Sequence, residues 1–330
     1  MMKFRTEVEL PTGLPSIDLE QRLLMMGSCF AENMGALFAE RKFRVDVNPF
    51  GILYNPLSIA KALTRILDGK AYGAEELFFY REQWHSYMHH GSFSATNKEN
   101  ALNQINSRLL QAAKALTETD WLMLTFGTAY VYRLKNTGEV VSNCHQCPER
   151  DFLRGRLTVE DIVAAYQPLM ERLLAVNAKL KVLLTVSPIR HLRDGLHANQ
   201  LSKATLLLAI DRLVELYPDR LFYFPSYEIV MDELRDYRFY ADDMAHPSPV
   251  TVAYLWECIE KTFFTDTTRK LTEEVMAVTR DVNHRPLHPE SEAYRAFTQQ
   301  IIDKIEILTK KCPYLDFHKE LELCHTRLNR

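Results

Sequence analysis

The fold of this chain is decided near its N-terminus by the stretch "LLMMGSCFAENMGALFAE", residues 23–40. The apolar run "RLLMMG" ends at Gly27 and has the length of a buried strand. The pattern predicts a strand over 22–27, a tight turn that glycine permits, and a helix that begins at Cys29. Apolar side chains then recur at helical spacing, at Phe30, Met34, Leu37 and Phe38.

The same order of strand and helix recurs about five times along the chain. Further strands are predicted over 43–51, 120–127, 180–188 and 220–230, and further helices over 56–67, 97–116, 158–177, 198–217 and 248–264. This order predicts an α/β fold with a mainly parallel sheet covered by helices on both faces. We expect one main domain over residues 1–265, with an irregular aromatic and His-rich insertion around 70–95. Residues 266–330 show helical patterns and are expected to form a helical C-terminal extension packed on it.

Composition excludes several classes of function. The formal net charge is -3, which gives no electrostatic reason to expect nucleic acid or an anionic membrane as a partner. No run of 18 apolar residues is present, and the first residues lack the apolar core of a signal peptide, so a cytoplasmic location is expected. The six cysteines are scattered and do not form a disulfide framework. The oligomeric state stays open.

Small or functional residues follow every predicted strand. They are Gly27 and Ser28 after the first, Asn48 and Gly51 after the second, Gly127 and Thr128 after the third, Arg190 and His191 after the fourth, and Asp243 and His246 beyond the last. Parallel strands end at a common edge of the sheet, where α/β proteins bind their ligands. The pattern therefore predicts an active-site rim.

Two members of this rim suggest nucleophilic catalysis. Ser28 would sit beside the first N–H groups of a helix, which are unpaired and can stabilise an oxyanion. On its own the stretch favours the simpler interpretation, a serine that only caps the helix. Asp243 precedes His246 by three residues, a spacing that lets the carboxylate orient the imidazole as a general base. Asp242 competes for that role, and a solvated loop is the plain alternative.

Over residues 20–262 the chain resembles the GSCFA family, which in turn resembles the SGNH/GDSL hydrolases. The motifs that carry the resemblance are "GSCFAENMG", "NPFGILYNP", "LTFGTAYVY", "NCHQCP", "TVSPIRH" and "FYADDMAHPS". It implies a flavodoxin-like three-layer α/β/α sandwich and a Ser–His–Asp triad. By motif position Ser28 would be the nucleophile, His246 the general base and Asp243 its orienting carboxylate.

The resemblance also implies an oxyanion hole, and here the sequence departs from the SGNH pattern. The N–H groups of Ser28 and Gly51 would be donors, with Gly127 and Thr128 beside them. SGNH enzymes usually carry Gly-x-Asn after the third strand, whereas this chain has Ala129 in place of the asparagine. Losing one such donor typically costs about 100- to 1,000-fold in rate. Spacing does not choose among the possible replacements, which are Thr128, Asn143, His145 and Arg190.

Other reactive side chains have structural interpretations. Cys29 is a rival nucleophile, but its place beside an apolar helix face favours a buried, inert thiol. The pair Cys144 and Cys147 lacks the second pair that a structural zinc site usually needs, so no metal and no cofactor is expected. We expect the substrate-binding residues to be Asn48, His85, Asn143, His145, Arg190 and His191.

These observations predict a serine hydrolase that acts on an ester or acyl group of a small molecule or glycan. An acyltransferase that uses the same triad is an alternative, with a hydroxyl acceptor in place of water. A non-catalytic binding module that retains the fold is a second alternative, favoured by Ala129. A metal-dependent enzyme that uses the His-rich stretch is a third.

Overall fold

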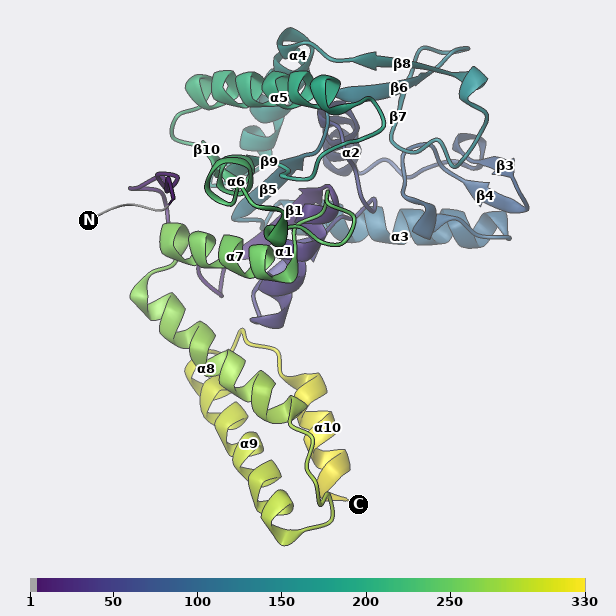
Figure 1. Cartoon of the computed structure of the whole chain (residues 1–330). Helices are drawn as coiled ribbons and strands as arrows, with labels where there is room; N and C mark the ends of the chain where they lie inside the picture. The colour runs from purple at the N-terminus through teal and green to yellow at the C-terminus, as the bar shows by residue number, and fades with distance from the viewer. Residues whose placement is uncertain (1–4, 330) are drawn as a thin grey trace.

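A five-stranded parallel sheet forms the centre of the molecule. The computed structural model describes residues 5–329 (Figure 1). The strand order is β10-β9-β5-β1-β2, and every neighbouring pair is parallel. All carboxyl ends therefore meet at one edge. The strands are β1 (Arg22–Gly27), β2 (Arg44–Val47), β5 (Trp121–Phe126), β9 (Lys181–Val186) and β10 (Leu221–Tyr223).

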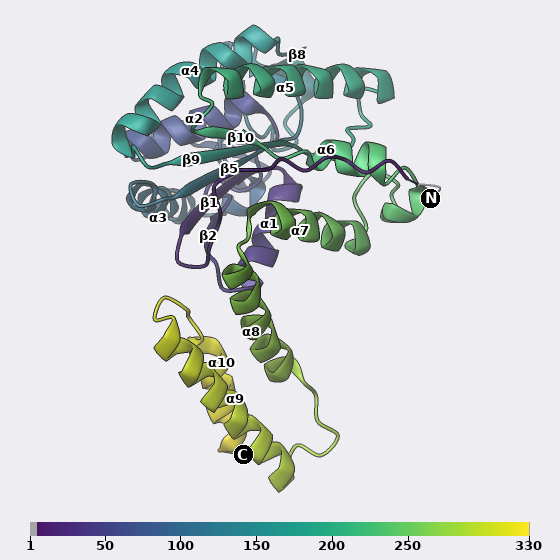
Figure 2. The same ribbon diagram turned by 90° about the vertical axis from the view of Figure 1, so that its left-hand side faces the viewer.

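Helices cover both faces of this sheet, as Figure 2 shows. Alternate residues of β1 point into two separate cores: Leu24 and Met26 into one, Leu23 and Met25 into the other. The first core is covered by α2 (Pro56–Asp68), α3 (Lys98–Leu116), α4 (Val159–Val176) and α5 (Leu196–Leu216). The second is covered by α1 (Cys29–Glu40) and α7 (Pro249–Phe263). The predicted three-layer α/β/α arrangement with a parallel sheet is confirmed.

Local capping explains where several helices begin. Asn55 caps α2 by accepting the N–H of Ser58, with proline at the first helical position. Thr158 and Asp161 form a reciprocal capping box at the start of α4. Both N-caps agree with the predicted helix starts.

Two small sheets flank the main one. The insertion around 70–95 holds a hairpin of β3 (Phe78–Tyr80) and β4 (Gln83–His85), so it is more regular than predicted. The second sheet has the order β7-β6-β8, and its strands β6 (Tyr130–Leu134) and β7 (Val140–Val141) form an antiparallel hairpin, as the alternating pattern of this stretch and the turn at its "NTG" indicate. Its third strand, β8 (Phe152–Arg156), is an addition to the prediction, because four of its five residues are exposed and leave no apolar pattern. The remaining short elements are η1 (Ala74–Glu76), η2 (Gly91–Phe93), η3 (Glu149–Asp151), α6 (Ser226–Glu228), η4 (Ile229–Glu233) and η5 (Tyr237–Phe239).

The C-terminal part is helical and stands away from the sheet in Figure 1. It consists of α8 (Asp266–Asn283), α9 (Glu292–Lys311) and α10 (His318–Leu328). Its contact with the main body includes an ion pair between Lys42 and Glu320 at 2.6 Å, and the Lys42 ammonium also lies over the Phe317 ring. Lys42 precedes β2, so this contact lies at the amino edge of the strands. The edge that carries Ser28 is the opposite one.

Candidate active site

The corner between β1 and α1 fixes the position of Ser28. Gly27 has a φ of +149°, and a Cβ there would lie 2.4 Å from the carbonyl oxygen of Thr125 on the neighbouring strand. Only glycine fits this approach without a shift of the backbone. Ser28 is the N-cap of α1, its Oγ accepts the N–H of Phe30 at 3.3 Å, and the residue is 2% exposed. Capping therefore holds the hydroxyl at the carboxyl edge of the sheet.

Asp243 and His246 form a hydrogen-bonded pair in the loop before α7. Asp243 Oδ2 lies 2.5 Å from His246 Nδ1. The other carboxylate oxygen accepts the backbone N–H groups of Ala245 and His246 at 3.0 and 2.9 Å. These backbone bonds, His246 first, and then the imidazole lower the pKa of Asp243 to about 2. The carboxylate is thus ionised and fixes the orientation of the ring.

Ser28 and His246 are not hydrogen bonded to each other in the described part of the chain. The Ser28 hydroxyl is engaged with Phe30, whereas the His246 side chain is 50% exposed and its Nε2 has no protein partner there. The structure forms the predicted hydrogen bond between Asp243 and His246. It leaves the Ser–His contact unmade.

Three of the four predicted oxyanion donors already have acceptors. The N–H of Gly51 donates to the Asn48 carbonyl at 2.7 Å, and those of Gly127 and Thr128 donate to the Tyr54 carbonyl at 2.8 and 3.0 Å. The Thr128 hydroxyl contacts Ser202 Oγ and accepts the N–H of Tyr130. Within residues 5–329, the N–H of Ser28 donates to no other residue, so it is the predicted donor that stays available.

Asn48 lies directly beside this corner. Its Oδ1 accepts the N–H of Gly27 at 2.9 Å, and the residue is 7% exposed. Its Nδ2 is buried and has no hydrogen-bond partner among the described residues. The sequence predicted Asn48 as a substrate-binding residue. The structure places it in contact with Gly27, the residue that precedes Ser28.

Lys203 is a buried cation at the site that the sequence analysis missed. The residue is 1% exposed, and its Nζ donates to the carbonyls of Gly127 and Ser187, each at 2.6 Å. Burial lowers the pKa of this ammonium to about 7. Lys203 therefore carries positive charge at the carboxyl ends of β5 and β9 below about pH 7 and loses it above that pH.

A sequence signal for Lys203 existed. On α5 the side chains of Asn199, Ser202 and Lys203 continue the buried stripe that Leu206, Ala209 and Ile210 form further along the helix. Ser202 also binds the chain after β5, since its Oγ accepts the N–H of Ala129 at 2.8 Å. Polar residues on the buried face of a helix need partners, and here the partners are the strand ends.

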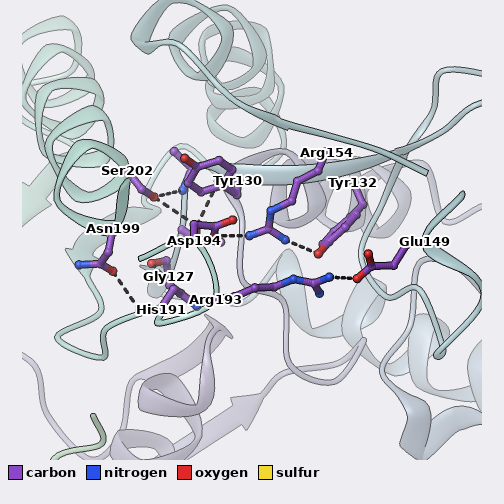
Figure 3. Close-up of polar contacts among 12 residues, drawn as sticks. Gly127, Tyr130, Tyr132, Glu149, Arg154, His191, Arg193, Asp194, Asn199 and Ser202 are labelled. Carbon is purple, nitrogen blue, oxygen red and sulfur yellow. Dashed lines mark hydrogen bonds and ion pairs between the residues drawn. The ribbon is translucent and has the colours of Figure 1, made fainter. Parts of the chain in front are cut away.

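The loop that follows β9 is held by hydrogen bonds and ion pairs to neighbouring elements, as Figure 3 shows. Asn199 accepts the N–H of His191 at 2.9 Å, and His191 Nε2 lies 3.2 Å from the Gly127 carbonyl. Burial and then the charge of Lys203 lower the pKa of His191 to about 4, so the ring is neutral at pH 7 and donates from Nε2. Ion pairs tie the loop to the β8 side, between Arg154 and Asp194 and between Arg193 and Glu149.

Arg190 lies next to the Asp243–His246 loop. Its Nε and Nη2 lie 3.3 and 3.2 Å from the sulfur of Met231, and the Tyr240 hydroxyl faces the same sulfur at 3.8 Å. Tyr240 pairs with Pro247 across the base of the loop that carries His246. A thioether is a weak acceptor, so the guanidinium keeps most of its capacity to bind a carboxylate or a phosphate.

The other three predicted substrate-binding residues form a separate cluster. The rings of His85 and His145 lie 4.5 Å apart, and Asn143 Oδ1 accepts the N–H of His145. The ring nitrogens of His85 face Ser94 Oγ and the Tyr80 carbonyl. His145 Nε2 faces the Ser86 carbonyl at 2.8 Å, and burial lowers the pKa of its ring to about 4. These groups are already paired and hold the insertion together.

Three cysteines, Cys258, Cys312 and Cys324, are buried, whereas Cys29, Cys144 and Cys147 are half-buried. Burial raises the pKa of Cys29, and it raises that of Cys144 to about 11. Among residues 5–329 no group of three or more His, Cys, Asp or Glu side chains is placed to hold a metal ion. Over the same residues, no helix is both long and apolar enough to cross a bilayer.

Comparison with known proteins agrees with the motifs at this edge of the sheet. No curated protein matches the chain. The family model described as GSCFA family matches residues 22–259, which include Ser28, Asn48, Lys203 and the Asp243–His246 pair. A second model, described as GSCFA domain protein, C-terminal domain, matches residues 275–330. The chain therefore belongs to the GSCFA family.

Proposed function

We propose that this protein is a serine hydrolase of the SGNH type that cleaves an ester or a related acyl group. The observation that carries the proposal is the Asp243–His246 pair. Its carboxylate holds Nδ1 of the imidazole and leaves Nε2 unpaired, which is the arrangement a general base needs. Ser28 supplies a hydroxyl at the end of β1, at the N-terminus of a helix whose dipole favours developing negative charge.

The proposed reaction has two halves. Ser28 Oγ attacks the acyl carbon, its proton passes to His246 Nε2, and the carbonyl electron pair moves to the oxygen to give an oxyanion. The bond to the leaving alcohol then breaks, and the alcohol takes the proton from His246. Water repeats the sequence on the acyl-serine and releases the acid. No cofactor takes part.

Assembly of the triad requires Ser28 Oγ and His246 Nε2 to come within hydrogen-bonding distance of each other. Catalytic hydrogen bonds are often long before substrate binds and tighten in the complex. The hydrogen bonds of Asp243 run to residues of the same loop, so the pair can move as a unit with its internal geometry kept.

Two cationic groups support a substrate with an acyl group near the strand ends. Lys203 lies under the Gly127 carbonyl, and Arg190 stands beside the loop of His246. We propose a small-molecule or glycan ester as the substrate class. The guanidinium of Arg190, whose described partner is the sulfur of Met231, can face negative charge on the substrate or in the transition state.

A fluorophosphonate probe tests the proposal directly. The serine oxygen would attack phosphorus, fluoride would leave, and mass mapping of the adduct would identify the residue. We expect one adduct on Ser28, absent in Ser28→Ala and in His246→Ala. Ser92→Ala and His318→Ala alter exposed residues of the same types and should keep it.

The alternative outcomes are informative. An adduct on Cys29 or on another serine would contradict the proposed nucleophile. An adduct on Ser28 that survives in His246→Ala would leave the serine but remove the Asp243–His246 pair from the mechanism. No adduct in the unaltered protein would contradict the hydrolase and favour a binding module.

A further inference from the structure

The side-chain amide of Asn48 has only one orientation that fits its surroundings. The group beside it at 2.9 Å is the N–H of Gly27, a donor, so the atom that faces it must be the oxygen Oδ1. The other amide atom is then Nδ2, which carries two donor hydrogens. The assignment of the amide thus follows from the hydrogen bond.

Nδ2 of Asn48 is one of six buried side-chain polar atoms that have no hydrogen-bond partner among the described residues. Buried donors are nearly always paired, because leaving one unpaired costs free energy. An unpaired donor next to a candidate nucleophile is explained if its acceptor arrives with the substrate.

The backbone at Asn48 sharpens this argument. Its φ is +46°, in the left-handed region where glycine is the most relaxed residue. The conformation is held by two backbone bonds, from Asn48 N–H to the Met25 carbonyl at 2.8 Å and from Gly51 N–H to the Asn48 carbonyl at 2.7 Å. Glycine would satisfy that backbone, so what asparagine adds is its amide.

We propose that Asn48 Nδ2 is an oxyanion donor and supplies the hydrogen bond that Ala129 lacks. The inference rests on the proposed hydrolase function. Oδ1 is anchored on Gly27, the residue before Ser28, and Nδ2 shares a carbon with Oδ1. The free N–H of Ser28 and the amide of Asn48 therefore flank the same corner.

The chemistry at this corner follows from the two donors. When Ser28 Oγ bonds to the acyl carbon, the former carbonyl oxygen becomes negative and accepts hydrogen bonds from Ser28 N–H and Asn48 Nδ2. His246 holds the proton taken from Ser28 until the alcohol leaves. The donors are fixed before the reaction, so they stabilise the transition state without reorganisation.

The test is the second-order rate constant with which a fluorophosphonate modifies Ser28. Asn48→Asp keeps the oxygen that accepts the Gly27 N–H and replaces the NH₂ by an acceptor. We expect this variant to react about 100- to 1,000-fold more slowly, the usual loss for one oxyanion donor. Asn97→Asp is the matched control, because Asn97 also accepts a backbone N–H through Oδ1, that of Asn100, where it caps α3. It should react within about threefold of the unaltered protein, since its amide has no contact with Gly27 or Ser28 among the described residues.

Two further measurements guard against a variant that fails to fold. Asn48→Gly suits the left-handed backbone and should show a loss of reactivity of similar size. In the unaltered protein with ¹⁵N-labelled asparagine, the NH₂ signals of Asn48 should shift and exchange more slowly once Ser28 carries the phosphonyl group. Unchanged signals, or a folded Asn48 variant that reacts at the normal rate, would overturn the proposal.

The outcomes separate this inference from the proposed function. If the unaltered protein forms no Ser28 adduct, both fail. If Ser28 reacts and the Asn48 variants react equally fast, the hydrolase stands and only the role of Asn48 falls.

Discussion

The corner that holds Ser28 and the loop that holds His246 are built in opposite ways. Ser28 is 2% exposed and lies between packed strands, whereas His246 and Asp243 have side chains 50% and 52% exposed. The neighbours of Ser28 are bonded across the sheet, while the bonds of Asp243 stay within its own loop. The nucleophile is therefore placed by the core of the fold, and the base by a local motif that can move.

This difference predicts that the loop can be altered without harm to the fold. In Asp243→Asn the imidazole loses the carboxylate that orients it, so we expect Ser28 to react with a fluorophosphonate about 100- to 10,000-fold more slowly. The thermal midpoint should hardly change, because both side chains are half exposed. Asp242→Asn, one residue away and also exposed, is the control and should retain normal reactivity. Equal losses in the two variants would mean that Asp243 has no specific role.

The buried amine of Lys203, near the corner of Ser28, predicts an effect of pH on stability. The pKa of Lys203 is about 7 in the fold, below the value of about 10.4 for an unfolded lysine. Between these values the unfolded chain holds a proton that the folded chain lacks, so this group makes the free energy of unfolding rise with pH. The expected slope is at most about 1.4 kcal/mol per pH unit.

Urea unfolding of the unaltered protein and Lys203→Met at pH 7, 8 and 9 measures this slope. The variant should lose the rise. Lys61→Met is the control, because Lys61 is exposed and donates to a single carbonyl. If Lys203→Met and the unaltered protein show the same slope, the ammonium stays charged in the fold throughout this range.

The close approach of Gly27 to Thr125 predicts that substitution of this glycine lowers the free energy of unfolding. A Cβ there would meet the Thr125 carbonyl oxygen at 2.4 Å, so Gly27→Ala must shift one of two neighbouring strands. We expect a loss of about 2–3 kcal/mol in the free energy of unfolding. Gly138→Ala also places a side chain at a positive φ, +73°, but meets nothing within 4 Å, so it shows the cost of a positive φ without a clash. A similar loss in both variants would show that contact with Thr125 does not matter.

The sequence predicted the features that depend on local pattern. The strand β1 and the helix α1 were predictable because buried parallel strands appear as short apolar runs and amphipathic helices repeat at 3.6 residues. The Asp243–His246 pair was predictable because three residues of spacing already bring the two groups together.

Features that depend on tertiary packing could be predicted only in part from the sequence. The second strand ends at Val47, earlier than predicted, because Asn48 adopts a positive φ that only the surrounding hydrogen bonds explain. Lys203 was missed because lysine is rarely buried, and its partners lie at the ends of two strands distant in sequence. The unpaired Nδ2 of Asn48 is likewise visible only once its neighbours are in place.

The smallest expected effect concerns Cys29, the rival nucleophile beside Ser28. Burial raises the pKa of its thiol, and the thiolate is the reactive form, so this cysteine should be inert at neutral pH. In Cys29→Ala we expect the reaction of Ser28 with the probe to change by less than about threefold, since a volume-reducing change at a half-buried site is modest. Alkylation of the folded protein by iodoacetamide at pH 7 should likewise leave Cys29 unmodified. Rapid alkylation there would show an activated thiol, and the buried corner would then hold the nucleophile in Cys29 rather than in Ser28.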